Sequence, residues 1–307
     1  MNNPPITPEQ NTPATPIHAM YADLSTLPNR HSSAHHHSAL EFVIILDGTL
    51  QYTVEKQTFH LHPGDSIFIN TNRLHAYGAI EAASQDNPND SSSFLSQNCH
   101  FAVLQIEPEL LYTQPVIAEK YVYPLLLSPK KSALIFDQSE NWHTVIFSEL
   151  TALIQLVTEK TDGFELTVQS KLYHFWHILY QHNILKDEHH LKHSAQTTQI
   201  QHMITYLHTH YQEKITLTDI AGAGMMCQSK CCRLFRSTLN QSPMEYLQNY
   251  RIKKSTTLLS HSALSITEIA LECGFHGASY FSETFRKLYG ISPKEYRKEA
   301  QKKTVKA

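Results

Sequence analysis

The sequence lacks any run of about 18 apolar residues, the length that a membrane-spanning helix needs. Its first residues, MNNPPITPEQNTPATP, are polar and rich in proline, and they lack the apolar stretch of a secretory signal peptide. Charge is also modest, since 17% of the 307 residues are charged and the formal net charge is −3. We therefore expect a cytoplasmic protein of about two globular domains, with no membrane partner.

Cysteine is scarce as well. The chain has five, an odd number without secretory context, so we expect reduced thiols rather than a disulfide framework: Cys99, Cys227, Cys231, Cys232 and Cys273. No CxxC pair recurs at zinc-ribbon spacing, which favours helix packing over a metal cluster for the three at 227–232. The nucleophile elbow, the phosphate-binding loop and the GxGxxG and HExxH motifs are absent, so ordinary hydrolase, kinase and dehydrogenase functions lack support.

The small net charge hides two halves of opposite sign. A polar, histidine-rich stretch, KDEHHLKHSAQTT at 186–198, is typical of a linker. Residues 1–195 carry 10 Lys and Arg against 20 Asp and Glu, a net charge of −10, whereas residues 196–307 carry 15 against 8, a net charge of +7. A basic C-terminal third favours binding to a polyanion, although a basic solvated face on an enzyme would have the same composition.

The N-terminal half has the pattern of an antiparallel β domain. We interpret residues 1–30, with several Pro and Thr, as a flexible arm. The apolar run LEFVIIL ends at Asp47-Gly48 and resumes as the alternating TLQYTVE, which predicts a hairpin. Further strands, SIFIN after a Pro63-Gly64-Asp65 turn and FAVLQIE at 101–107, follow without intervening helices. Residues 31–135 are therefore predicted to form an antiparallel sandwich or barrel.

Between residues 136 and 195 the apolar period becomes helical. One stripe comprises Ile146, Leu150, Leu153, Ile154 and Val157, and a second comprises Leu172, Phe175, Trp176 and Leu179. The pattern leaves two possibilities open with similar weight: the stripes pack on the β domain of the same protomer, or they form a dimer interface.

The C-terminal third contains an internal repeat. The landmarks that recur at an offset of 49 or 50 are Ile220-Ala221 with Ile269-Ala270, Phe235 with Phe285, Ser242-Pro243 with Ser292-Pro293, and Tyr246 with Tyr296. Each copy has the pattern of a short helix, a turn and a second helix with a buried apolar face. This pattern predicts two helix-turn-helix motifs, at 217–238 and 267–290, inside an all-α domain at 196–300.

These residues resemble the AraC family of transcriptional regulators. The second copy carries the most specific agreement, in the family's order and spacing: Arg251, Leu258-Leu259, Ile266, Glu268-Ile269-Ala270, Cys273-Gly274-Phe275, Ser279-Tyr280-Phe281, Phe285-Arg286-Lys287, Gly290 and Ser292-Pro293. The N-terminal half resembles the cupin-type sensory domain of such regulators, with His35, His37, Glu41, Gly48, Pro63-Gly64-Asp65 and His75 in the places of the cupin pattern. The resemblance covers roughly residues 31–300.

The resemblance implies two DNA-reading helices, at 227–237 and 277–288. Its DNA-binding positions are Ser229, Cys232, Arg233 and Arg236 in the first helix, and Ala278, Ser279, Glu283, Arg286 and Lys287 in the second. Arg233 is the strongest candidate because its bidentate fork can read guanine. Glu283 departs from the Arg common in the family, which leaves a cytosine preference or a neutral role equally open. Aromatic residues at this spacing, such as Tyr280, are interpreted as part of the core of the helix-turn-helix rather than as side chains that stack on DNA bases.

The first motif departs from the family pattern at its turn. Met225 stands where relatives have Gly or Asn, and Cys227 stands where they commonly have a Ser helix cap. We expect a non-glycine residue at positive φ and a missing cap, each costing about 1 kcal/mol, unless Ser229 shifts the cap inward.

The resemblance implies a ligand pocket in the cupin domain, with His35, His37, Glu41, Tyr52 and His75 as candidate ligand-binding residues. His35, His37, Glu41 and His75 are also the residue types with which a metallo-cupin holds Fe, Mn or Zn. We favour a site without a catalytic metal or other cofactor, because a DNA-binding half gives the pocket a regulatory use.

The sequence therefore predicts an α+β multidomain protein: an N-terminal antiparallel cupin-like β-barrel, linker helices, and a C-terminal all-α domain with two helix-turn-helix motifs. The resemblance implies a non-enzymatic regulator that binds double-stranded DNA and a small-molecule effector, as a homodimer, with RNA polymerase as a further partner. The alternative is a metal-dependent cupin enzyme with an accessory DNA-binding domain.

Overall fold

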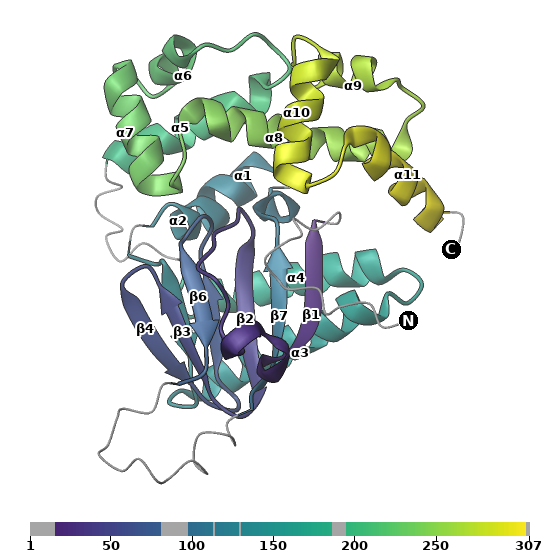
Figure 1. Ribbon diagram of the computed structural model, residues 1–307. Coiled ribbons are helices and arrows are strands. Elements are labelled where there is room, and N and C mark those ends of the chain that lie inside the picture. Colours follow the sequence, from purple (N-terminus) through teal and green to yellow (C-terminus); the bar gives the residue numbers. More distant parts are fainter. Residues whose placement is uncertain (1–15, 81–97, 113, 129, 186–194, 305–307) are drawn as a thin grey trace. The chain divides into compact units, whose positions relative to one another are not determined.

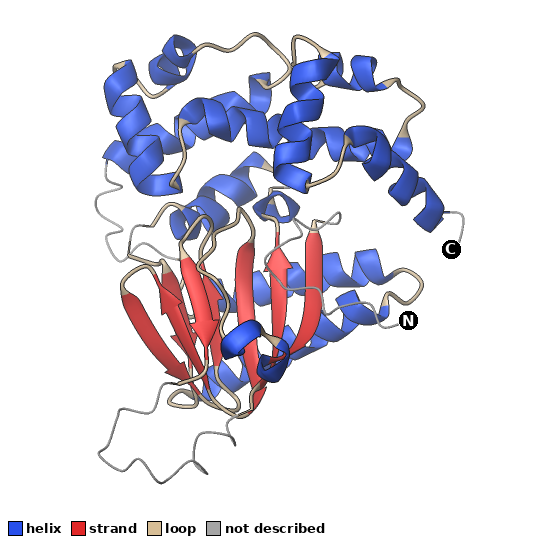
Figure 2. Ribbon diagram, viewed as in Figure 1, coloured by secondary structure: helices blue, strands red, loops and turns tan. Residues whose placement is uncertain are grey.

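The computed structural model of the protein describes residues 16–80, 98–112, 114–128, 130–185 and 195–304. The described chain divides into two compact units, one ending at residue 185 and the other beginning at residue 195. Every strand of the described residues lies in the first unit, and the second contains helices alone (Figure 2). The expected combination of a β-rich half and an all-α half is confirmed.

Two antiparallel sheets form the first unit (Figure 1). The larger has the strand order β1 (Ile17–Asp23), β7 (His100–Ile106), β2 (Leu40–Asp47), β5 (Ser66–Ile69) and β8 (Ala133–Phe136). The smaller has the order β4 (Gln57–Leu61), β3 (Leu50–Val54) and β6 (His75–Gly78). The sheets do not close into one barrel, so the cupin fold takes its sandwich-like form, and side chains from both sheets share one apolar core.

Strand β2 is buried on both faces, which explains its continuous apolar sequence. Val43 and Ile45 point into the core between the sheets. Phe42, on the other face, contacts Phe175 of a covering helix with ring centroids 5.2 Å apart. One face of the larger sheet is thus closed by the second sheet and the other by helices.

The predicted hairpin across Asp47-Gly48 is wrong. β2 pairs with β5 and β7, and β3 pairs with β4 and β6, so the turn carries the chain from one sheet to the other. Gly48, at φ +78°, allows this turn because a Cβ there would lie 1.9 Å from the carbonyl oxygen of Asn98. The true hairpin joins β3 to β4 through Glu55, also at positive φ.

The predicted arm over residues 1–30 needs correction where the structure describes it. β1 pairs with β7 along its whole length, and the short helical turns Leu24–Thr26 and Pro28–Arg30 follow it. Leu24 is fully buried in the core. Backbone pairing and apolar burial therefore fix residues 17–30, and the remainder of the expected arm, residues 1–15, lies outside the described residues.

Helices α3 (Asn141–Glu159) and α4 (Phe164–Gln181) carry the two predicted stripes and belong to the first unit. α3 packs on the larger sheet, against β1, β2, β7 and β8, and α4 packs on α3 (Figure 1). All residues of both stripes are buried. Packing within the protomer therefore accounts for the stripes. Short helical segments precede them: Pro108–Leu111, α1 (Pro115–Ile117), a π-helical turn at Ala118–Val122, and α2 (Tyr123–Leu126).

Seven helices make up the described part of the second unit. They are α5 (Ala195–His210), α6 (Leu217–Ala223), α7 (Gln228–Leu239), α8 (Pro243–His261), α9 (Ile266–Glu272), α10 (Ala278–Tyr289) and α11 (Pro293–Thr304). The pairs α6–α7 and α9–α10 are the two predicted helix-turn-helix motifs, and α8 joins them (Figure 1).

Candidate functional site

The two copies of the sequence repeat make the same aromatic packing contact in the structure. Phe235 of α7 contacts Tyr246 edge to face at 5.9 Å, and the equivalent Phe285 of α10 contacts Tyr296 edge to face at 5.4 Å. Both phenylalanines are fully buried. An aromatic pair of this geometry stabilises by roughly 0.5 to 1.5 kcal/mol beyond the area it buries. Each motif therefore fixes its second helix by the same contact.

The helices before and after each second helix begin with capping boxes. The cap residue and the acid three positions later are Thr216 with Asp219, Ser242 with Glu245, Ser265 with Glu268, and Ser292 with Glu295. In each, the cap oxygen accepts from the acid's backbone N–H, and the carboxylate accepts from the cap's backbone N–H. These hydrogen bonds fix where four helices start and so set the direction of α7 and α10 between them.

The turns of the two motifs have the same backbone path but different residues. Met225 has φ +51°, and its counterpart Gly274 has φ +80°. In each turn the next residue, Met226 or Phe275, donates its N–H back to the alanine five positions earlier. The expected non-glycine residue at positive φ is thus present in the first motif.

Cys227 is the N-cap of α7, and its side chain makes no capping hydrogen bond. The cap has not moved inward to Ser229, because the helix begins at Gln228. The backbone N–H of Lys230 nevertheless lowers the pKa of the exposed Cys227 thiol. All five cysteines are free, and Cys99, Cys231 and Cys273 are buried as packing residues, whereas Cys227 is exposed and Cys232 half-buried.

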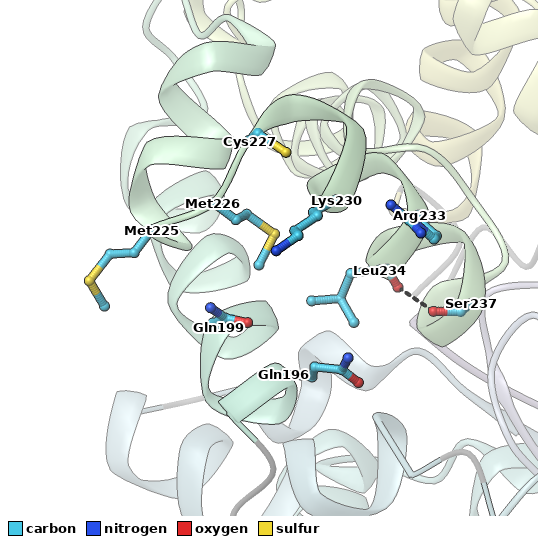
Figure 3. Close-up of a pocket in the computed structure, with 9 residues that line it drawn as sticks. All are labelled: Gln196, Gln199, Met225, Met226, Cys227, Lys230, Arg233, Leu234 and Ser237. Atoms are coloured by element: carbon cyan, nitrogen blue, oxygen red, sulfur yellow. Dashed lines mark hydrogen bonds between the residues drawn. The ribbon is translucent and has the colours of Figure 1, made fainter.

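Helix α7 presents the expected polar face to solvent. Ser229, Arg233 and Arg236 are exposed and Cys232 is half-buried, while Cys231, Phe235 and Leu239 on the opposite face are buried. Beside this face runs a groove of about 570 Å³ between α7 and the first turns of α5 (Figure 3). The residues that line it are Gln196, Gln199, Met225, Met226, Cys227, Lys230, Arg233, Leu234 and Ser237. Two cations and no carboxylate line the groove, so its electrostatics suit an anion.

Helix α10 has the same arrangement. Ser279, Glu283, Arg286 and Lys287 are exposed and Ala278 is half-buried, while Phe281 and Phe285 are buried in the core. Tyr280 differs from the expectation that it belongs to that core, since 51% of it is exposed. The apolar spacing correctly predicted that Phe281 and Phe285 are buried. Tyr280 lies beside this apolar face of α10, and its hydroxyl contacts Gln248 of α8.

In the first unit, three of the candidate ligand residues contact the carboxylate of a fourth, Glu41. Oε2 of Glu41 lies 3.0 Å from Nε2 of His37, and Oε1 lies 3.6 Å from Nε2 of His75 and accepts from the Tyr52 hydroxyl. His35 pairs with His75 through a β-bridge, with ring centroids 4.2 Å apart. The structure therefore brings all five predicted residues together.

Electrostatics stabilise the ionised form of Glu41. Burial alone would raise the pKa of this carboxyl, but the hydrogen bond from His37 and the charges of His75 and His37 hold it well below its usual range. Burial likewise opposes the charged form of His37, yet its hydrogen bond and attraction to Glu41 raise its pKa. Burial lowers the pKa of His75 to about 4. The cluster thus contains a buried carboxylate beside an imidazole kept neutral.

Gln105 completes this site, and sequence reasoning missed it. It lies opposite Glu41 in the β2–β7 register, and its Nε2 donates to Glu41 Oε2 at 2.8 Å. No local motif marks this glutamine. Only the register of two strands more than 60 residues apart in sequence brings it to the carboxylate.

The comparisons with known proteins agree with both units. A family model described as a helix-turn-helix domain matches residues 220–299, and one described as a cupin domain matches residues 24–84. The chain is 29% identical to an uncharacterized HTH-type transcriptional regulator, YdeC of Bacillus subtilis (strain 168), over 94% of both chains. It is 27% identical to the HTH-type transcriptional activator RhaS of Escherichia fergusonii, over 88% of this chain and 89% of that one.

The chain is an AraC-type transcriptional regulator. Its N-terminal half contains the cupin domain and its C-terminal half carries the helix-turn-helix pair. Among solved structures, a fatty-acid-bound ToxT from Vibrio cholerae covers 95% of this chain and 97% of that one, at 14% identity and a TM-score of 0.47. No described helix of the regulator is both long and apolar enough to span a membrane.

The donor set of the regulator's cupin site fits a divalent transition metal. His35, His37 and His75 each place Nδ1 2.8 to 3.1 Å from a backbone carbonyl, of Ser33, Ala39 and Arg73 respectively. A neutral ring that donates from Nδ1 keeps its lone pair on Nε2, whereas His37 also donates from Nε2 to Glu41. The candidate ligand atoms of the three rings lie within 4.8 Å of one another, and the buried Nε2 of His75 has no hydrogen-bond partner. Once His37 gives up the proton that it shares with Glu41, the three imidazoles and the ionised Glu41 would form a set that Fe, Mn or Zn accepts.

Proposed function

We propose that this regulator reads DNA with α7 and α10 and responds to a small molecule held at the histidine cluster of the cupin domain. One observation carries the DNA part: two helices in equivalent motifs bury an apolar face and expose a polar face that contains Arg or Lys. Such a pair is expected to enter successive major-groove segments about one helical turn, roughly 34 Å, apart.

The opposite net charges of the two halves of the chain favour DNA binding by the C-terminal half alone. Residues 196–307 have a net charge of +7 and residues 1–195 a net charge of −10. Lys and Arg that neutralise phosphates release counterions, so affinity should fall steeply as salt rises. The acidic half should not bind DNA. We infer that Arg233 reads a base, that Arg236, Arg286 and Lys287 contact phosphates, and that Ser229, Cys232, Ala278, Ser279 and Glu283 line the interface.

Selection from a random duplex pool by the full-length protein tests this proposal and yields a binding site. Affinity for that site should fall with increasing salt, and Arg233→Ala should lose the preference at one base pair, worth about 1 to 3 kcal/mol. Lys56→Ala is the matched control, because Lys56 is an exposed cation of the cupin domain. Retained preference in Arg233→Ala, or a complex insensitive to salt, would contradict the assignment.

We propose that the effector site is built on His35, His37, His75 and Glu41, with Tyr52 and Gln105 orienting the carboxylate. Although the sequence favoured a site without metal, the close approach of the three rings and the orphaned Nε2 of His75 favour a bound divalent metal. Such a metal would offer open positions to an oxygen of the effector. The Tyr52 hydroxyl and the Gln105 amide donate to Glu41 and keep its oxygens aimed at the rings.

Metal analysis of the purified full-length protein tests the cupin site. Near-stoichiometric metal is expected in the wild type and its loss in His75→Ala, with the thermal midpoint raised when metal is restored to the wild type alone. His60→Ala is the control, because His60 lies on the surface of β4 in the same domain. A wild type that holds no metal and shows no thermal shift with Fe, Mn or Zn would refute the metal and leave the DNA proposal untouched.

We further infer that the regulator works in the cytoplasm, as a homodimer, by binding rather than catalysis, and that RNA polymerase is its partner at a promoter. These inferences rest on its similarity to regulators such as RhaS. A dimer would use faces other than the stripes of α3 and α4, because the larger sheet and α4 already bury them. Sedimentation of the full-length protein across concentrations tests the dimer.

A further inference from the structure

Tyr280 is an exposed aromatic residue on a helix whose other aromatic side chains are core. Half of it, 51%, is exposed, whereas Phe281 and Phe285 are fully buried. A single exposed aromatic is common on protein surfaces and implies nothing alone. The position and the hydrogen bond of this one distinguish it.

A second helix holds the Tyr280 hydroxyl. Nε2 of Gln248, on α8, donates to this hydroxyl at 2.5 Å. The ring also lies 6.0 Å from the ring of Phe275. Because the hydroxyl oxygen accepts from Gln248, its own hydrogen stays available for an acceptor outside the protein. The side chain is thus held in place as a donor.

The surroundings of this donor carry charges of both signs. Glu245 lies three residues before Gln248 on α8, and its pKa is lowered by its hydrogen bonds with Ser242 and by the charges of Arg236 and Lys287. Cations of α7 and of α10 therefore both act on this part of α8. Along α10 itself, Tyr280, Glu283 and Lys287 follow at i, i+3 and i+7, which puts them on one side of the helix.

We propose that the Tyr280 hydroxyl donates a hydrogen bond to a backbone phosphate of bound DNA and so fixes how α10 seats in the groove. Tyrosine hydroxyls are among the groups that bind phosphate oxygens, and such contacts position a protein without reading sequence. Tyr280 is then a positioning residue, with Gln248 as its support. The inference rests on the proposed DNA-binding role of α10.

Tyr280→Phe in the full-length protein tests the inference, because the change removes the hydroxyl and keeps the ring. On the selected duplex, we expect the affinity to fall about three- to tenfold. The slope of affinity against salt should stay unchanged, since a neutral donor releases no counterion, whereas Lys287→Gln should reduce that slope by about one. A repeated selection with Tyr280→Phe should return the same base preferences.

Tyr21→Phe is the matched control, because Tyr21 is similarly exposed, at 55%, but lies in the cupin domain. Gln248→Ala should weaken binding in the wild type and add little to Tyr280→Phe, since both act through one hydroxyl. Wild-type affinity in Tyr280→Phe, or altered base preferences, would overturn the inference. A wild type that binds no DNA, or a Lys287→Gln variant with an unchanged salt slope, would instead count against the proposed role of α10.

Discussion

Replacing Met225 with glycine should stabilise the DNA-binding unit. Met225 is held at φ +51° between α6 and α7, a region that a side chain with a Cβ occupies at a cost. The side chain gives little in return, since 76% of it is exposed. The backbone must nevertheless adopt this φ, because the N–H of Met226 reaches back to the carbonyl of Ala221. Glycine would keep the same path without the clash.

Two opposing terms set the magnitude. Relief of the left-handed conformation contributes about 1 to 2 kcal/mol. The greater freedom of glycine in the unfolded chain costs about 0.4 to 1 kcal/mol. The difference is a gain of about 0 to 1.6 kcal/mol in the free energy of unfolding. Its central value, about 0.8 kcal/mol, corresponds to roughly 3 to 6 °C in the thermal midpoint of a domain near 100 residues. Met225→Asn should show a smaller gain, because asparagine tolerates this φ better than methionine.

Scanning calorimetry of the full-length protein, with amide hydrogen exchange to assign the affected helices, measures this effect. Gly274→Ala in the second motif is the matched comparison, since Gly274 occupies the equivalent turn at φ +80°. A Cβ there would lie 2.5 Å from the carbonyl oxygen of Tyr211, which Arg251 also binds. Gly274→Ala should therefore destabilise by more than Met225→Gly stabilises.

A lower midpoint in Met225→Gly, with faster hydrogen exchange in α6 and α7, would contradict this prediction. That result would mean that the left-handed residue stores no strain, or that its exposed thioether makes a contact worth more than 1 kcal/mol. A gain in Met225→Gly together with no loss in Gly274→Ala would also contradict the account, because the two turns share one backbone geometry.

Three further changes test the local energetics. Cys227→Ser should stabilise α7 by about 1 kcal/mol, because a serine at this N-cap accepts hydrogen bonds from backbone N–H groups that the thiol leaves uncapped. Chemical denaturation measures this gain, and an unchanged midpoint would mean that the thiol already caps the helix. The backbone N–H and the side chain of Ser265 hydrogen-bond to Glu268 and lower the pKa of its carboxyl from the ordinary value near 4.5. The ionised carboxylate therefore contributes fully to stability at neutral pH, and this contribution is lost as the pH falls below 4.5 through the lower folded pKa. The thermal midpoint of Glu268→Gln should depend less on pH than that of the wild type between pH 6 and pH 3. Phe42→Ala should destabilise the cupin domain by about 3 to 5 kcal/mol, because Phe42 is fully buried between the sheet and Phe175. Equilibrium unfolding measures this loss of stability, and Tyr21→Ala, at an exposed position, is the control.

Patterns of neighbouring residues predicted many elements of this fold, whereas they could not predict which strands pair across long stretches of sequence. The repeat identified both helix-turn-helix motifs and even the positive φ of Met225, since a turn between two short helices demands that conformation whatever the residue. Asp47-Gly48 was recognised as a turn but not as a change of sheet, because the residues of a turn do not specify which strands pair. Residues 17–30 resemble a loose arm by composition, yet pairing with β7 fixes them as strand and helical turns.

The same distinction applies to the sites. The cupin pattern predicted that His35, His37 and His75 would meet Glu41, whereas Gln105 depends on the β2–β7 register and is invisible locally. Periodicity placed Phe281 and Phe285 in the core but could not separate Tyr280 from them, because its exposure depends on where α8 runs. Residues whose neighbours come from the same motif were predictable, and residues whose partners come from another element were not.

The two helix-turn-helix motifs share a fold but differ in how firmly their second helices are held. α10 follows a glycine at the left-handed position, and its N-cap is Gly277, a residue nearly as favourable there as serine. α7 follows a strained methionine and begins at a cysteine without a capping bond. Each defect removes about 1 kcal/mol from the first turn of α7, and that turn carries Ser229 and precedes Arg233 by one turn. If DNA contacts Ser229 and Arg233 as proposed, it would stabilise the first turn of α7, whereas the first turn of α10 would need no such stabilisation.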